Sequence, residues 1–131
     1  MKILDATFLI DYLIGEQTAI EYLEVNGDEE FVIPLPAYTE AVVGEGNKPE
    51  GSDIDGVRNA LNWGEVYTTE ERHAVVGAEI ADEIDSGGPY IDGCDALIAA
   101  VGRQLSAPVV SDDSDLTHPE TKKVIDVEEY R

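Results

Sequence analysis

The chain has 131 residues, 43% of them hydrophobic, and carries 29 acidic against 8 basic side chains, for a formal net charge of −21 at pH 7. This length and apolar content fit one domain with its own core, and we expect residues 1–131 to form it. No stretch approaches the roughly 20 apolar residues that span a bilayer, and no secretory leader opens the chain, so we expect a cytoplasmic protein without membrane contact.

The acidic side chains are spread along the whole chain rather than gathered in one tail. This spread favours a solvated acidic surface over a single docking face for a basic partner. Scarce lysine and abundant acid resemble the proteins of salt-accumulating, halophilic archaea. In molar salt the Debye length falls to about 3 Å, which screens the self-repulsion of such a chain. We therefore expect a halophilic source and a fold that is less stable at ordinary salt.

The N-terminal half alternates short apolar runs with stretches of helical spacing. The apolar runs predict strands at residues 2–5 and 31–33. The helical spacing, stopped each time by Gly or Asn-Gly, predicts helices at residues 7–14, 17–25 and 36–43. A turn-rich loop follows at residues 44–53, after which Ser52 or Asp53 can cap a helix that contains Val57 and Trp63.

The C-terminal half continues this alternation. A short strand is predicted at residues 66–68, and Thr69 is the expected cap of a long helix that reaches Ile84. A second apolar helix begins at Asp95 and runs to about Leu105. The last two predicted strands, with a turn around His118 between them, are residues 109–110 and 124–125.

Strands that alternate with helices predict an α/β fold. We expect a three-layer α/β/α sandwich with a central, mainly parallel sheet of four to five strands. Ligands bind such sheets in the crevice beyond the carboxyl ends of the strands.

Four acidic residues are placed to meet in that crevice. Asp5 and Asp113 follow predicted strands, while Glu40 and Asp95 lie at the start of predicted helices. Carboxylates packed together repel one another unless a divalent cation joins them, and oxygen ligands suit Mg²⁺ or Mn²⁺. Such an ion lowers the pKa of water and stabilises charge on a phosphate, so the pattern points to phosphodiester hydrolysis. Because acids are abundant in this chain, their positions alone do not establish the site.

Hydroxyl side chains lie close to three of these acids in the sequence. Each can hold a carboxylate in place, and each can equally act as a helix or turn cap. These residues are Thr7, Thr39 and Ser111.

Four segments together resemble the motifs of PIN-domain nucleases, in the order of that family. Residues 5–13 resemble the opening motif, and Thr39-Glu40 after an apolar strand resembles the second. Residues 95–100 resemble the most recognisable segment, and residues 109–116 the last. The match covers essentially the whole chain, and a domain this short is most similar to the VapC-type toxins of toxin–antitoxin pairs.

The resemblance implies a Mg²⁺- or Mn²⁺-dependent endoribonuclease that forms a homodimer and is silenced by a small antitoxin protein. It implies that Asp5, Glu40, Asp95 and Asp113 form the catalytic, metal-binding quartet. Thr7 matches the family's small hydroxyl residue near the first acid. Our hypothesis for the reaction is that a metal-activated water, held by Asp5, Asp95 and Asp113 with Glu40 completing the site, attacks the RNA phosphodiester in line and leaves a 5′-phosphate.

The chain departs from the family pattern in two respects. The last motif contains Asp112, Asp113 and Asp115, and we favour Asp113 because it lies two residues after Ser111, although Asp112 or Asp115 can take its place. Basic residues are also sparse. The candidates for phosphate contact, each also suited to a surface ion pair, are Arg58, Arg72 and Arg103.

For the single cysteine, the two histidines and two further aspartates we expect mainly structural roles. The single Cys94 excludes an internal disulfide, and we expect it to be a small buried residue in a reducing cytosol. His73 and His118 lack the spacing of metal ligands and are expected to be surface or structural residues. Asp92 is either an outer acid of the site or a helix cap, and Asp11 is expected to be solvated.

Two other readings of the sequence remain. A phosphoacceptor receiver domain also gathers acids around Mg²⁺, but it needs an acidic pair after the first strand and a lysine after a late strand. Here Asp5 stands alone, and Lys122 and Lys123 precede the last predicted strand. The second alternative keeps the PIN fold but lacks catalysis, leaving a binding or scaffold domain whose acids serve salt tolerance.

Overall fold

Five short strands form one sheet in the computed structural model, which describes residues 1–131. The strands are β1 Lys2–Leu4, β2 Phe31–Pro34, β3 Glu65–Tyr67, β4 Val109–Ser111 and β5 Val127–Glu129. Their order in the sheet is β3-β2-β1-β4-β5, and every neighbouring pair is parallel. The predicted α/β class with a parallel central sheet is therefore confirmed.

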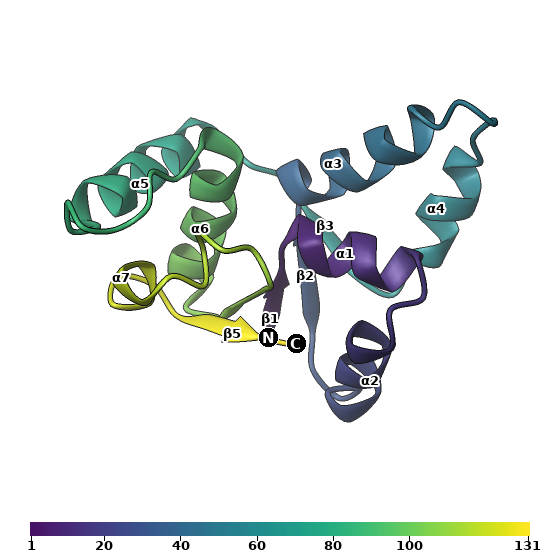
Figure 1. Ribbon diagram of the computed structural model, residues 1–131, viewed down its shortest axis with the longest axis horizontal. Helices are drawn as coiled ribbons and strands as arrows, with labels where there is room; N and C mark the ends of the chain where they lie inside the picture. The colour runs from purple at the N-terminus through teal and green to yellow at the C-terminus, as the bar shows by residue number, and fades with distance from the viewer.

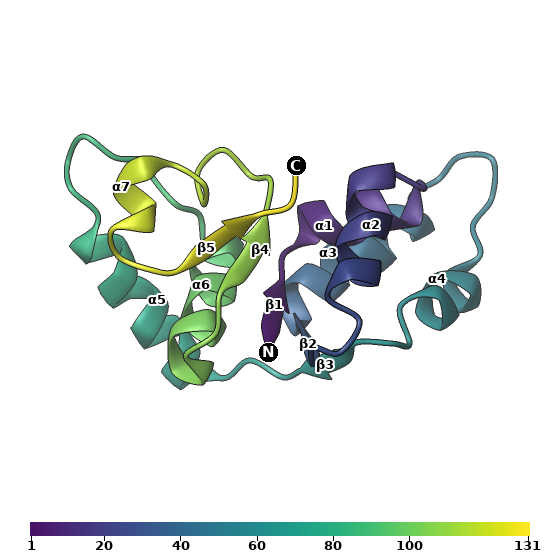
Figure 2. The same ribbon diagram turned by 90° about the horizontal axis from the view of Figure 1, so that it is seen from below.

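The helices form a layer on each face of this sheet (Figure 1). One layer contains α1 Ala6–Leu13, α2 Gln17–Val25, α3 Leu35–Gly46 and α4 Ile54–Ala60. The other contains α5 Glu71–Glu83, α6 Gly93–Leu105 and the short α7 Pro119–Lys122. From β1 the chain moves outward to β2 and β3, then crosses back to β4 and β5. Right-handed connections that run in opposite directions place their helices on opposite faces, which gives the three layers (Figure 2).

The central strands are buried on both sides. Ile3 and Leu4 of β1 are completely inaccessible, and every residue of β2 and β4 is buried. Helix α6 covers one face of these strands with an uninterrupted buried run, residues 98–102. Continuous apolar strands are typical of parallel sheets with helices on both faces.

Side-chain caps set several helix starts. The Asp5 carboxylate accepts from the Thr7 backbone N–H at the start of α1, and the Asp92 carboxylate accepts from the Asp95 N–H at the start of α6. Asp53 caps α4 in the same way. The cap interpretation of Asp92 is thus confirmed. The predicted cap of α5 is wrong, because this helix begins after Glu70, one residue beyond Thr69.

Four predicted boundaries are wrong. Helix α4 ends at Ala60, so Trp63 lies beyond it rather than within the predicted helix. The last strand lies at residues 127–129 rather than 124–125, where the backbone instead turns back to the Thr121 carbonyl at the end of α7. That helix itself occupies part of the predicted turn. Helix α3 also continues past Gly44 to Gly46, because a glycine weakens an exposed helix without having to end it.

The structure shows the surroundings of three side chains whose burial was predicted from the sequence. Cys94 is exposed, because it lies in the opening turn of α6, ahead of the buried run of that helix. His73 is fully buried, and its Nδ1 accepts from the Glu70 N–H at 2.9 Å, which confirms a structural role. Asp11 is half-buried rather than freely solvated, and its carboxylate accepts from the Tyr130 hydroxyl. None of the helices combines the length and hydropathy needed to cross a bilayer.

Candidate active site

The sheet has its topological switch point between β1 and β4. The chain leaves β1 toward β2 on one side, while β4 on the other side is reached from β3 by a crossover. Ligands bind open α/β sheets beyond the carboxyl ends of strands at such a point. Asp5 directly follows β1, and Ser111 ends β4 with Asp113 two residues later.

Asp5 is a buried carboxylate with three hydrogen-bond donors. It is 2% exposed, and it accepts from the Thr7 backbone N–H at 2.7 Å and the Thr7 hydroxyl at 3.1 Å. The Ser111 hydroxyl also donates to it. Burial raises the pKa of Asp5 to about 6, against the effect of these hydrogen bonds, which lower it. Thr7 and Ser111 therefore hold the carboxylate of Asp5 in place, as predicted. The Thr39 hydroxyl instead donates to the Leu35 carbonyl of its own helix.

Three further carboxylates converge beside Asp5. One oxygen each from Asp95, Asp113 and Asp115 lies within 4.8 Å of the others. The Asp113 carboxylate is aimed by two backbone donors, because its Oδ2 accepts from the N–H groups of Asp115 at 2.9 Å and Leu116 at 3.1 Å. The Asp113 N–H in turn donates to the Ser111 hydroxyl at 2.9 Å. The loop that carries Asp113 and Asp115 is thus tied to Asp5 through one serine.

Burial and neighbouring negative charges oppose the ionisation of two acids in this region, Asp95 and Asp5. Partial burial, followed by the negative charges of Asp113, Asp92, Asp5 and Asp115, raises the pKa of Asp95 to about 7. The charge of Asp113 also contributes to the raised pKa of Asp5. Three of the four predicted site residues, Asp5, Asp95 and Asp113, therefore lie in one electrostatic region.

Glu40 lies at the rim of this region. It is exposed on α3 and is not part of the group of acids within 4.8 Å. It faces the opening turn of α6, since its charge, after burial and the charge of Asp92, helps to raise the pKa of the Cys94 thiol. Glu40, Cys94 and Thr69 line the same hollow of about 400 Å³.

The two acids that flank Asp113 in sequence have different positions. Asp115 lies beside Asp113 rather than in its place, and the sequence had offered it only as a substitute. Asp112 is exposed, with its carboxylate beside the Arg131 guanidinium. The signal for Asp115 was its separation from Asp113 by a single residue, Ser114.

The donor set fits a hard divalent cation. All the converging ligands are carboxylate oxygens, the type that Mg²⁺ and Mn²⁺ prefer, and neither a histidine nor the Cys94 sulfur belongs to the group. Carboxylates with raised pKa values resist ionising together. A cation that binds them relieves this repulsion.

No basic side chain of the chain is left unpaired. All eight Lys and Arg residues form ion pairs with acids. The three proposed for phosphate contact pair locally, Arg58 with Asp55, Arg72 with Glu70 and Arg103 with Glu83, which confirms the surface ion-pair reading.

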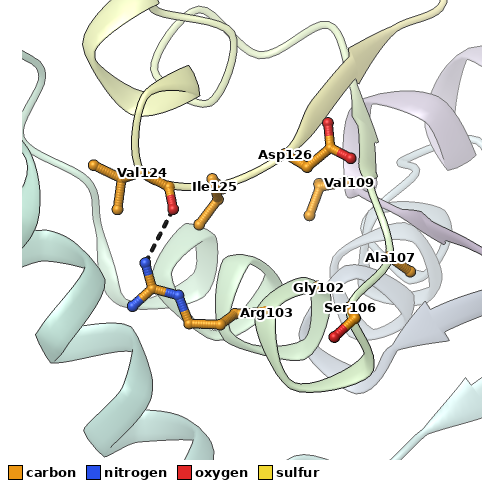
Figure 3. A pocket seen from close by; sticks show the side chains of 8 residues that line it. All are labelled: Gly102, Arg103, Ser106, Ala107, Val109, Val124, Ile125 and Asp126. Atoms are coloured by element: carbon orange, nitrogen blue, oxygen red, sulfur yellow. Dashed lines mark hydrogen bonds between the residues drawn. The ribbon is translucent and has the colours of Figure 1, made fainter.

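Arg103 also borders a cavity of about 260 Å³ near the amino ends of β4 and β5. Figure 3 shows this cavity, where Arg103 donates to the Val124 carbonyl at 3.0 Å. Two lining residues lie just before strands: Ala107 is two residues before the start of β4, and Asp126 is the residue before β5. This cavity is therefore separate from the acidic cluster at the carboxyl ends.

Comparisons with known proteins agree with this architecture. A family profile described as the PIN domain matches residues 2–122. A search of curated proteins finds no match. Among solved structures, a toxin–antitoxin complex from Klebsiella pneumoniae is similar, with a TM-score of 0.75, 20% identity and coverage of 92% of this chain and 94% of that chain.

Two further solved structures match over almost their full length. They are VapBC2 from Rickettsia felis bound to a promoter DNA fragment and DNA-bound VapBC from Salmonella typhimurium. Each gives a TM-score of 0.79 at 17% identity and covers 99% of this chain and 98% of that chain. At these identities the similarity shows a shared fold.

Proposed function

The chain belongs to the PIN-domain family, and we propose that it is a Mg²⁺- or Mn²⁺-dependent endoribonuclease that acts as the toxin of a toxin–antitoxin pair. The observation that carries the proposal is the convergence of Asp95, Asp113 and Asp115 beside the buried Asp5 at the switch point of the sheet. Similarity to solved toxin–antitoxin complexes supports the toxin role. The PIN-domain match leaves the receiver-domain alternative without support.

In this proposal Asp5, Glu40, Asp95 and Asp113 form the catalytic quartet, and Asp115 is added to it. Asp95, Asp113 and Asp115 would hold the cation, with Asp5 behind them and Glu40 at the rim on α3. A divalent cation held there would lower the pKa of water and offset the charge that develops on the phosphodiester. Hydrolysis in line with the departing oxygen leaves a 5′-phosphate.

The chain's own hydrogen bonds prepare this site before any ligand binds. Thr7 and Ser111 fix the Asp5 carboxylate through hydrogen bonds to both of its oxygens. The Asp115 and Leu116 N–H groups fix Asp113 through Oδ2 alone. Preorganised ligands need less rearrangement when the charged substrate arrives, which favours the transition state.

The charge distribution limits how RNA binds. Since every Lys and Arg side chain is paired and the net charge is −21, the surface supplies no free cation for the RNA backbone. We infer that recognition depends on cation–phosphate contact in a salt-rich, halophilic cytosol, where repulsion is screened. Residues 1–131 act as one domain, assembled as a homodimer and silenced by a small antitoxin.

Cleavage of RNA by the purified chain tests the activity. Structured and single-stranded RNAs are incubated in molar KCl with Mg²⁺ or Mn²⁺, and the products are resolved on denaturing gels. We expect cleavage that EDTA and Asp95→Asn abolish and that Asp82→Asn, an exposed acid of α5, leaves unchanged. Folded protein that leaves every RNA intact would instead favour the scaffold alternative.

The toxin role needs a separate experiment in cells. Induced expression of the chain should arrest growth, and co-expression of a short neighbouring open reading frame should restore it. Growth that continues despite accumulation of the active protein would contradict the toxin role while leaving the nuclease assignment in place.

A further inference from the structure

Asp112 is the acid of the site loop that does not join the cluster. It directly precedes Asp113, yet its carboxylate oxygen lies 3.4 Å from Nη1 of Arg131. Its backbone N–H donates to the Thr7 hydroxyl at 3.0 Å, which fixes the main chain at the entrance to the loop. The backbone of Asp112 is therefore tied to the site, while its side chain is paired with Arg131, 19 residues later in the sequence.

The Arg131 guanidinium connects three segments of the chain. Its Nη1 lies 3.1 Å from Asp11 Oδ2 on α1, and its Nη2 lies 3.4 Å from Glu16 Oε2 just before α2. The third partner is Asp112 in the loop after β4. Because an arginine fork presents several donors in a fixed plane, one side chain can hold all three carboxylates.

Tyr130 fixes the backbone from which Arg131 extends. Its side chain is 9% exposed and packs edge-on against Phe8, with ring centroids 4.9 Å apart. Its hydroxyl donates to Asp11 Oδ2 at 2.6 Å, the same oxygen that Arg131 approaches. Asp11 is thus the shared anchor of Tyr130 and Arg131.

We propose that Arg131 is a positioning residue that holds Asp112 away from the metal cluster and so leaves Asp113 and Asp115 as the ligands of this loop. The inference rests on the proposed function, because it concerns the same cation site. A fifth carboxylate that turned toward the cation would compete with Asp113 and Asp115 for coordination and draw the loop away from the backbone hydrogen bonds that aim Asp113. Arg131 attracts that carboxylate and offers it a paired position outside the cluster.

The sign of the effect separates positioning from general electrostatics. Removing any positive charge makes this acidic protein more negative, which by itself strengthens the binding of a divalent cation. Loss of positioning has the opposite effect, because Asp112 is released toward the ligands. Arg58, an exposed residue paired with Asp55 on α4, provides the matched control for the charge alone.

Titration of the full chain with Mn²⁺, followed by electron paramagnetic resonance of the free ion, tests the inference. We expect Arg131→Gln to weaken Mn²⁺ binding by about tenfold, the scale of residues that orient metal ligands. Arg58→Gln should bind as tightly as the wild type or more tightly. Addition of Asp112→Asn to Arg131→Gln should restore the affinity, because the released side chain is then a neutral amide that competes poorly for the cation.

The double variant also separates positioning from a purely structural anchor. If Arg131 matters only through Asp11 and the stability of the fold, Asp112→Asn will not restore binding, and that result overturns the inference. Binding by Arg131→Gln that equals Arg58→Gln also overturns it, with the proposed nuclease site left standing. A wild-type protein that binds no Mn²⁺ would remove both the proposed function and this inference.

Discussion

Asp95→Asn should make the metal-free protein more stable while it abolishes the metal site. The Asp95 carboxylate is partly buried among acids, and its pKa is raised from 3.8 to about 7. It accepts no side-chain or loop hydrogen bond that an asparagine would lose; only its backbone N–H is engaged, as donor to Asp92. Asparagine therefore removes an unfavourable charge and keeps the shape of the side chain.

The magnitude follows from the raised pKa of Asp95. A rise from 3.8 to about 7 corresponds to about 4 kcal/mol of preference for the protonated form. The group is only partly buried, so solvent screening reduces this to about 2 kcal/mol. The positive end of α6 favours the ionised Asp95 by about 0.5 kcal/mol, which the substitution also removes. We expect a net gain of about 1.5 kcal/mol in the free energy of unfolding at pH 8.

The pH dependence gives the sign check. A carboxyl group whose pKa is higher in the folded state than in the unfolded state stabilises the fold below pH 3.8, and this stabilisation is lost as the pH rises through about 7. Asparagine, which resembles the protonated acid, does not titrate. The advantage of Asp95→Asn over the wild type should therefore be near zero at about pH 4 and fully developed at about pH 8.

Urea denaturation at constant ionic strength, repeated across this pH range with EDTA to remove metal ions, measures the difference in free energy of unfolding between Asp95→Asn and the wild type. The same titrations with Mn²⁺ in place of EDTA measure the effect of the cation. Mn²⁺ at about one hundred times its dissociation constant should stabilise the wild type by about 2.7 kcal/mol and leave Asp95→Asn unchanged. Asp82→Asn, which removes one exposed charge from α5, should retain the Mn²⁺ effect. A variant that is less stable than the wild type at pH 8, or that gains as much from Mn²⁺, would refute the reasoning.

Three further predictions follow from packing, hydrogen bonding and charge. Ser111→Ala removes a donor from buried Asp5 and should lower the free energy of unfolding by about 1–3 kcal/mol in urea titrations; an unchanged midpoint would contradict this. Gly77→Ala places a methyl carbon 2.9 Å from the Ala96 carbonyl oxygen and should lower the free energy of unfolding by about 1–3 kcal/mol. Gly44→Ala, whose added carbon meets no atom within 4 Å, should raise it by about 0.5 kcal/mol. Equal melting temperatures for the two variants would contradict this packing. The melting temperature should rise as KCl is raised into the molar range, and a flat or falling curve would show that self-repulsion at net charge −21 does not limit the fold.

Local patterns in the sequence were sufficient for most of the fold. Helix α2 lies at the predicted residues 17–25, because its apolar spacing is bounded by clear stop signals. Strand β5 was predicted too early in the chain, because Val124-Ile125 is more apolar than Val127-Glu128-Glu129. An edge strand is paired on one side only and needs little burial, so backbone register decides its position more than side-chain hydropathy does.

The site was predictable only as far as strand ends define it. Asp5 follows β1 and Asp113 follows β4 closely, so the parallel sheet brings them together. The separate positions of Asp112 and Asp115 depend on tertiary contacts: Asp112 lies beside Arg131, and Asp113 accepts from the Asp115 N–H. A loop rich in Asp has no periodicity from which such contacts could be read. The exposure of Cys94 also depends on tertiary packing, because Cys94 lies in the first turn of α6, ahead of the residues of that helix that are buried.

The distribution of charge explains why a cation is central to this protein. Acids gather at the carboxyl ends of β1 and β4, where the raised pKa values of Asp5 and Asp95 show that ionisation is opposed. Every basic side chain is committed to an acid, and only Arg131 among them contacts the site loop, through Asp112. A bound divalent ion would therefore be the main positive charge that a phosphate meets in the crevice. Binding of the ion and stability of the fold must then be linked, because the same carboxylates that would coordinate the metal destabilise the metal-free protein.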